Sequence, residues 1–253
     1  MSALPSPAFS PVESSEQESA PKLRVIHPDD FVDDIPPTPE ESAYSATDEA
    51  LNFRTHLVGF GVSVIAAVAA CWASWQLTDI WVQLACLAYG LSQMAVYGFS
   101  TLSHAEFPDR QRHLYRTLDQ VSIFLFIAAS STPFMVVLNR NPVGMSLLAI
   151  TWALALVGVG MKLFVKKREL VPVWYYVVVG WFPGLSLLQS APALGAFGLG
   201  LLLTSAATLT TATWFLCNDH KATWFHGVWH VMVLFATVGQ FVVILRFVLP
   251  YAA

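Results

Sequence analysis

Long apolar stretches that contain no Asp, Glu, Lys or Arg dominate the chain beyond residue 54. Six of them run over 55–78, 80–105, 120–139, 141–161, 170–218 and 222–245. A helix needs roughly 20 residues to cross about 30 Å of hydrocarbon. Five stretches fit one helix each, whereas 170–218 is too long for one crossing and Ser190-Ala191-Pro192 interrupts it near its middle. The pattern therefore predicts an all-α bundle of seven transmembrane helices.

The N-terminal part of the chain has the opposite character. Residues 1–46 hold 8 of the 15 prolines, and residues 1–49 hold 11 of the 17 acidic residues. Such a composition cannot bury enough apolar surface to offset the entropy of ordering. It also lacks the basic and apolar segments of a secretory signal. We expect a disordered, acidic, proline-rich tail over 1–46, followed by a seven-helix membrane domain over 47–253.

Basic side chains near the helix ends set the expected orientation. If seven helices alternate in direction, two bases, Arg140 and Arg246, fall on the side away from the N-terminus. The remaining bases beyond the tail fall on the N-terminal side: Arg54, Arg110, Arg112, Arg116, Lys162, Lys166, Lys167, Arg168 and Lys221. Because cytoplasmic loops are enriched in Lys and Arg, the N-terminus is expected in the cytoplasm. The expected location is a multi-pass position in the plasma (inner) membrane.

Composition narrows the class of protein further. With 55% hydrophobic and 12% charged residues, the chain is too apolar and too poor in charge for a soluble globular domain. Its bases beyond the tail sit in short loops beside apolar stretches, which argues against nucleic acid as a partner. Three cysteines, all within apolar stretches, do not form a disulfide scaffold. The expected partner is the lipid bilayer.

A few polar side chains stand at the ends of apolar stretches, where burying them is expensive. An ionisable group at mid-membrane costs about 2.5–3.5 kcal/mol, so such groups are functional candidates. Ser100 and His104 close the second predicted span, Asp119 opens the third, and His226 and His230 open the seventh. A spacing of four places both members of a pair on one helical face. The alternating topology brings His104, Asp119, His226 and His230 to the cytoplasmic end, with Ser100 one turn deeper than His104.

Three imidazoles and a carboxylate at one depth favour zinc. Three histidine ligands with a fourth position open is the arrangement of a catalytic zinc site, and zinc lowers the pKa of bound water from 15.7 to about 7. We therefore predict Zn²⁺ held by His104, His226 and His230. Asp119 would serve as the base or orienting acceptor for the zinc-bound water, and Ser100 as an oxyanion donor or a support for its neighbours. This chemistry predicts hydrolysis of a carbonyl compound that arrives from the membrane.

Other interpretations of these residues stay open. The His-x-x-x-His pair can be two interfacial histidines, or ligands of a haem, although a haem leaves Asp119 and Ser100 without a task. A serine in a membrane helix often bonds the carbonyl four residues earlier. Asn52 and His56, before the first span, either hydrogen-bond the metal's ligands or anchor the helix at the interface.

The order and spacing of these motifs resemble the progestin and adipoQ receptor family, in its bacterial hemolysin III-like branch, over about residues 48–250. The matching motifs are Glu49-x-x-Asn52-x-x-x-His56, Ser100-x-x-x-His104, Leu118-Asp119, Ser130-Ser131-Thr132-Pro133-Phe134 and His226-x-x-x-His230. The resemblance implies seven membrane helices, a cytoplasmic N-terminus and an intramembrane zinc ion. Its ligands would be the three predicted histidines, with Asp119 and Ser100 beside the metal-bound water.

Relatives in the receptor branch are associated with hydrolysis of ceramide-type lipid amides, which implies a lipid amide or ester as the substrate class. Gln120-Val121-Ser122 follows Asp119 where relatives commonly carry an aromatic residue or histidine, so ceramide itself is not implied. Two alternatives remain. One is a receptor or signalling protein with structural zinc, whose tail binds an unidentified cytoplasmic partner. The other is a membrane-lytic protein, although no predicted span shows a continuous polar stripe.

Overall fold

The computed structural model describes residues 46–164 and 172–252, and the regular structure of this part of the chain is entirely helical. The predicted tail lies outside the described residues, apart from Ala46. The main helices are α1 (Ala46–Trp75), α2 (Ile80–Ser103), α3 (Asp109–Leu138), α4 (Pro142–Phe164), α5 (Val173–Trp181), α6 (Leu187–Cys217) and α7 (Trp224–Val243). Short helical turns are η2 (Phe182–Ser186), η3 (Asp219–Lys221), η4 (Ile244–Val248) and η5 (Leu249–Ala252). The predicted all-α fold is confirmed for these residues.

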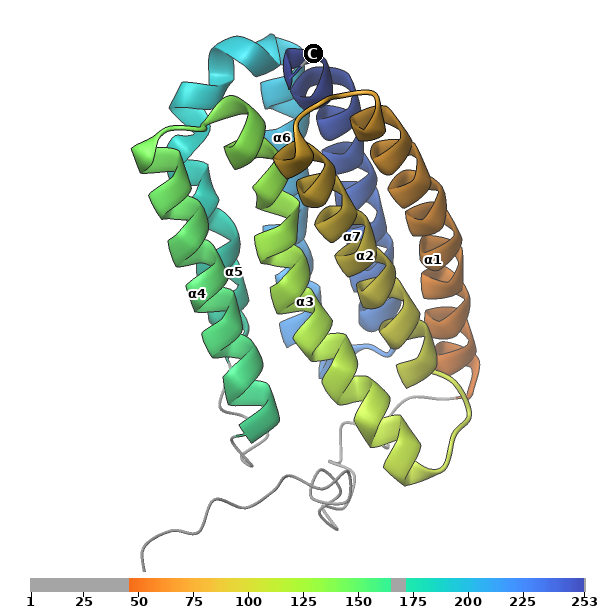
Figure 1. The fold of residues 1–253 in the computed structure, drawn as a ribbon. Helices are drawn as coiled ribbons and strands as arrows, with labels where there is room; N and C mark the ends of the chain where they lie inside the picture. The colour runs from red at the N-terminus through yellow and green to blue at the C-terminus, as the bar shows by residue number, and fades with distance from the viewer. Residues whose placement is uncertain (1–45, 165–171, 253) are drawn as a thin grey trace, which may run out of the picture.

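The helices lie side by side and alternate in direction (Figure 1). α2 packs between α1 and α3, α4 packs on α3, and α7 packs on α6 and α1. The start of α1, the end of α2 and the start of α3 therefore share one end of the bundle, which we call the N-terminal end. The C-terminus lies at the other end, which we call the C-terminal end (Figure 1).

Six helical stretches of the described chain are long and apolar enough to cross a membrane. The fifth covers Val173–Cys217 and is 45 residues long. It passes through η2, which contains Pro183, and its backbone leaves helical geometry at Gly195, where φ is 60° and ψ is −179°. A side chain makes such a backbone costly, so glycine suits it. The interruption expected at Ser190-Ala191-Pro192 thus has a backbone counterpart just beyond Pro192, which itself lies inside α6.

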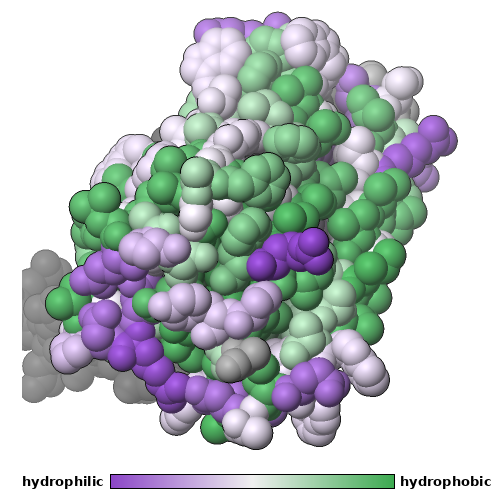
Figure 2. Space-filling model, turned by 90° about the horizontal axis from the view of Figure 1, so that it is seen from above, coloured by the Kyte–Doolittle hydropathy of each residue, from purple (hydrophilic) through white to green (hydrophobic). Residues whose placement is uncertain are grey.

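Large apolar side chains cover much of the outer surface. Leu188 is 89% exposed, Trp75 74% and Ile65 71%. Figure 2, which views the molecule from the C-terminal end, shows hydrophobic residues over much of that face, with hydrophilic ones in patches. A soluble monomer rarely exposes contiguous apolar surface on this scale, so a lipid environment explains it better.

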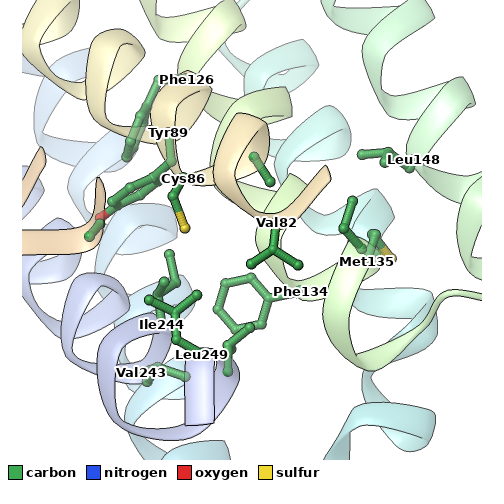
Figure 3. Packing of buried hydrophobic residues seen from close by; sticks show 14 of the residues in the cluster. Val82, Cys86, Tyr89, Phe126, Phe134, Met135, Leu148, Val243, Ile244 and Leu249 are labelled. Carbon is green, nitrogen blue, oxygen red and sulfur yellow. The ribbon is translucent and has the colours of Figure 1, made fainter. Parts of the chain in front are cut away.

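The largest group of buried apolar residues lies toward the C-terminal end of the bundle, and we call it the apolar cluster. It joins α2, α3, α4, the end of α7 and the turns that follow α7 (Figure 3). Its labelled members are Val82, Cys86, Tyr89, Phe126, Phe134, Met135, Leu148, Val243, Ile244 and Leu249. This packing joins the helices whose other ends carry the candidate site.

Candidate metal centre

Three histidines from two helices meet at the N-terminal end. His104 is the C-cap of α2, while His226 and His230 lie one turn apart at the start of α7. One ligand atom from each residue lies within 4.8 Å of the other two. The ring centroids of His104 are 5.2 Å from His226 and 5.0 Å from His230, and those of His226 and His230 are 4.6 Å apart. The structure therefore brings together the three residues predicted as metal ligands.

Two carboxylates hold two of these rings from outside. His104 Nδ1 lies 2.6 Å from Glu49 Oε2, at the start of α1, and His226 Nδ1 lies 3.1 Å from Asp219 Oδ2, in η3. A carboxylate accepts a hydrogen bond from Nδ1–H, which fixes the tautomer and presents the Nε2 lone pair to a metal. Carboxylate–histidine pairs of this kind surround many zinc sites.

The third ring, His230, is held by a hydroxyl. His230 is 1% exposed, and its Nδ1 lies 3.3 Å from Thr55 Oγ1. Thr55 Oγ1 also donates to the backbone oxygen of Asn52 at 2.9 Å. Because that bond uses the only hydroxyl proton, the Thr55 oxygen accepts from His230 Nδ1–H. All three histidines thus have the tautomer that leaves Nε2 to a metal.

His56 lies directly against this group. Its ring stacks on His230 with 3.5 Å between centroids and 24° between planes, and the edge of Tyr97 approaches it at 5.2 Å. His56 is 3% exposed and Asn52 1%. Such burial argues against interface anchoring for either residue. A side chain at Gly59 would place its Cβ 2.5 Å from the Tyr97 ring, so this glycine lets Tyr97 pack beside His56.

Asp119 and Ser100 lie on the same cavity wall as the histidines. Ser100 is 1% exposed, and its side chain hydrogen-bonds with Asp119 in the third turn of α3. Both residues line the cavity that His226 and His230 also line. The described contacts of the Ser100 side chain thus point to the carboxylate rather than to its own helix.

The electrostatics of His104 favour its neutral form. This residue lies just past the membrane-spanning part of α2. Burial lowers the pKa of His104, and the hydrogen bond with Glu49 opposes that shift without cancelling it. The imidazole is therefore unprotonated at neutral pH, which is the state that binds a metal.

A cavity of about 490 Å³ extends from the histidines along the inside of the bundle. Its wall is mostly apolar and comes chiefly from α3, α5, α6 and α7. Ser186 and Ser190 line it toward the C-terminal end. The volume lies within the roughly 300–1,000 Å³ range of small-molecule sites. A long apolar group can therefore lie in the cavity with its polar end at the histidines.

Sequence reasoning missed the outer partners of the histidines. Glu49 belonged to a recognised motif but had no role assigned, and Thr55 and Asp219 were not singled out. Thr55 immediately precedes His56 in the sequence. If the face of α1 that turns toward α7 were known, this position would indicate that Thr55 can reach a histidine of α7. Asp219 stands in a turn seven residues before His226, where no helical spacing applies.

Comparison with known proteins identifies the family. Residues 44–241 match the family described as haemolysin-III related. The chain belongs to this family. Hemolysin-3 of Bacillus cereus is 30% identical over 207 residues, which cover 81% of this chain and 94% of that protein. The Hemolysin-3 homolog of Bacillus subtilis (strain 168) is 27% identical over 203 residues, or 80% and 95% of the two chains.

The similarity extends to animal proteins. Human monocyte to macrophage differentiation factor is 22% identical over 177 residues, which cover 67% of this chain and 72% of that protein. The predicted relation to hemolysin III and to progestin and adipoQ receptor proteins is thus confirmed. Together with the apolar helical stretches, it makes the chain a multi-pass integral membrane protein.

Proposed function

We propose that this haemolysin-III related protein is a zinc-dependent membrane hydrolase that cleaves a lipid amide or ester. One observation carries the proposal: three imidazoles converge at one end of a long apolar cavity whose wall also carries the hydrogen-bonded Ser100–Asp119 pair. A metal that served only to hold the helices together would not require a buried carboxylate in the wall of the same cavity.

The donor set fits zinc. Tetrahedral zinc with Zn–N bonds of about 2.0–2.1 Å holds its nitrogen ligands roughly 3.3 Å apart. The three ligand atoms lie within 4.8 Å of one another, so small side-chain rotations bring them to that spacing. The rings contact one another edge to face, with centroids 4.6–5.2 Å apart. That leaves no room for a macrocycle between two of them, which argues against haem.

Each side chain then has a defined task. His104, His226 and His230 would hold the zinc ion, which supplies Lewis acidity and an activated water for hydrolysis. Asp119 accepts the proton that the attacking water loses and passes it to the leaving nitrogen or oxygen. The hydroxyl of Ser100 orients the Asp119 carboxylate.

We propose further that the chain crosses the membrane seven times, with Val173–Cys217 crossing twice. The chain reverses direction within α6, at Gly195, so that the rest of α6 runs antiparallel to α5, which supports this count (Figure 1). The bases at the N-terminal end support a cytoplasmic position for that end in a plasma (inner) membrane. The substrate would then enter from the inner leaflet.

Metal analysis of the purified protein tests the first half of the proposal. The parent should carry one zinc ion, and His226→Ala and His230→Ala should lose it. His220→Ala is the matched control, because His220 is exposed in the neighbouring turn η3. A parent without zinc, or variants that keep it, would contradict the metal site.

Lipid analysis tests the second half. Membranes of cells that express the parent should accumulate a free fatty acid that cells expressing His104→Ala do not. Asp119→Asn should keep most of its zinc and lose turnover. If Asp119→Asn instead keeps full function, the zinc is structural and the receptor alternative holds. Conductance of liposomes that survives chelation would favour the membrane-lytic alternative.

A further inference from the structure

One lysine, and no arginine, lines the cavity among the described residues. Lys162 lies in the last turn of α4, and it is the α4 residue that reaches the cavity wall in this part of the chain. Its side chain is half-buried. The cavity residues nearest to it along the chain are Val173 and Tyr176, at the start of α5. Lys162 therefore lies at the N-terminal end of the cavity, as the histidines do (Figure 1).

The charge of Lys162 is not balanced within the described part of the chain. Arg116 lies 3.9 Å from Glu49, and Arg140 pairs with Asp79 at the C-terminal end. No ion pair or hydrogen bond is present for the Lys162 ammonium among the described residues. A partly buried cation without a counter-charge is unfavourable in an apolar wall, and it attracts an anion into the cavity.

The positions of the charged groups suggest how a ligand lies. The three histidines and Asp119 come from α2, α3 and α7, whereas Lys162 comes from α4, on the other side of α3 (Figure 1). An acyl chain can follow the apolar wall toward Ser190, with its carbonyl beside Asp119. The group on the far side of the amide or ester then extends toward Lys162. A lysine that only reaches for the membrane surface would have no need to line the cavity.

We propose that Lys162 recognises the headgroup, and that the preferred ligand is an acyl lipid with an anionic group a few bonds beyond its amide or ester. That group is a carboxylate, as in an N-acyl amino acid, or a phosphate. The inference rests on the proposed function for the placement of the carbonyl, but the recognition of charge by Lys162 can be measured as binding alone.

The test compares three lipids with the same acyl chain. N-palmitoylglycine carries a carboxylate, N-palmitoyl-O-phosphoethanolamine carries a phosphate, and N-palmitoylethanolamine is neutral. Their dissociation constants are measured by displacement of a neutral fluorescent acyl probe from the full-length protein in detergent. The parent should bind an anionic lipid about tenfold more tightly than the neutral one, the size of effect that a close charge pair supplies. The two anionic lipids separate a carboxylate from a phosphate preference.

Variants assign the preference to its residue. Lys162→Gln should bind all three lipids equally, while Lys162→Arg should retain most of the preference. Arg54→Gln should behave as the parent, because Arg54 is exposed at the same end and lies outside the cavity. Zinc content serves as the check that each variant is folded. The measurements are repeated after chelation, since a carboxylate can also bind the metal.

The outcomes separate the two proposals. The role of Lys162 would be overturned if the parent bound the three lipids equally. It would also be overturned if the preference for anionic lipids survived in Lys162→Gln or disappeared on chelation. Hydrolysis of the neutral lipid with no charge preference would do the same while leaving the hydrolase intact. Charge-selective, Lys162-dependent binding without turnover of any lipid would overturn the hydrolase and leave the headgroup site.

Discussion

The two ends of the bundle are joined by different kinds of contact. Toward the C-terminal end, α2, α3 and α7 meet through the apolar cluster, in which Tyr89 and Ile244 are fully buried. At the N-terminal end, the same helices and α1 meet through side-chain hydrogen bonds, such as that of His104 with Glu49. One end thus consists mainly of close packing and the other of directional polar contacts.

The difference separates the stability of the fold from the chemistry of the site. Apolar packing tolerates changes of residue type when volume is conserved, but it loses energy when a cavity is opened. A polar group buried with its partner loses far more from a change of chemistry than from a change of volume. Substitutions at the two ends should therefore affect different measurements.

The largest effect on stability is expected from Ile244→Ala in the apolar cluster. Ile244 is fully buried, and truncating such a side chain costs about 2–5 kcal/mol because a cavity remains. Denaturant or thermal unfolding in detergent measures the loss. Zinc content of the folded fraction should equal that of the parent. Leu188→Ala is the control, since Leu188 is 89% exposed and should change stability little. Loss of zinc from folded Ile244→Ala would show that the two ends are coupled.

Glu49→Gln should have a smaller effect, and it should change zinc affinity rather than stability. The amide no longer supplies the negative charge that orients His104 and raises its basicity, and removal of such a partner typically weakens metal binding about 10–100-fold. Competition with a chromophoric chelator measures the zinc affinity. Glu106→Gln is the matched control, because Glu106 is exposed just beyond α2. An unchanged affinity in Glu49→Gln would remove Glu49 from the site.

The pH dependence of zinc affinity should show the shifted pKa of His104. Burial lowers this pKa below the ordinary value for histidine, about 6.5. Protons compete with zinc at His104 only below that lowered pKa, so the share of the pH dependence that comes from His104 should set in below about pH 6.5. Because the Glu49 bond raises the pKa, Glu49→Gln should move that onset to still lower pH. A shift to higher pH would contradict the assigned contact.

The helices could be predicted from the sequence because their apolar stretches are long, but their ends could not. The stretch 80–105 predicts α2, observed as Ile80–Ser103, to within two residues. α3 starts at Asp109, well before the stretch 120–139. Its first turns carry charged residues, so the charge-free stretch begins later than the helix does; these include Arg110, Arg112 and Arg116. A charge-free stretch measures the depth of the hydrocarbon, whereas a helix can continue beyond it into the polar region.

The meeting of the histidines could also be predicted, since it needs only spacing within a helix and the direction of each helix. His226 and His230 share a face through their separation of four, and alternation brings His104 to the same end. The contacts of Asp219 and Thr55 depend on the conformation of a turn and on the rotation of α1 about its axis. No spacing rule predicts either quantity, so the hydrogen-bond partners of the histidines could be assigned only from the structure.

The smallest expected effect concerns a polar atom at the apolar end. The Tyr89 hydroxyl is buried and has no hydrogen-bond partner among the described residues, whereas His104 and His226 of the metal centre are held through Nδ1. Removing an unpaired buried hydroxyl relieves a desolvation penalty, so Tyr89→Phe should be neutral or stabilise the protein by about 1 kcal/mol. Thermal unfolding measures the change, and zinc affinity should stay at the parent value.

Tyr97→Phe is the comparison, because the Tyr97 hydroxyl lies 2.5 Å from Thr237 Oγ1 and its loss should destabilise the protein. If Tyr89→Phe destabilises as much as Tyr97→Phe, an internal water binds the Tyr89 hydroxyl, and the apolar end relies on polar contacts as well.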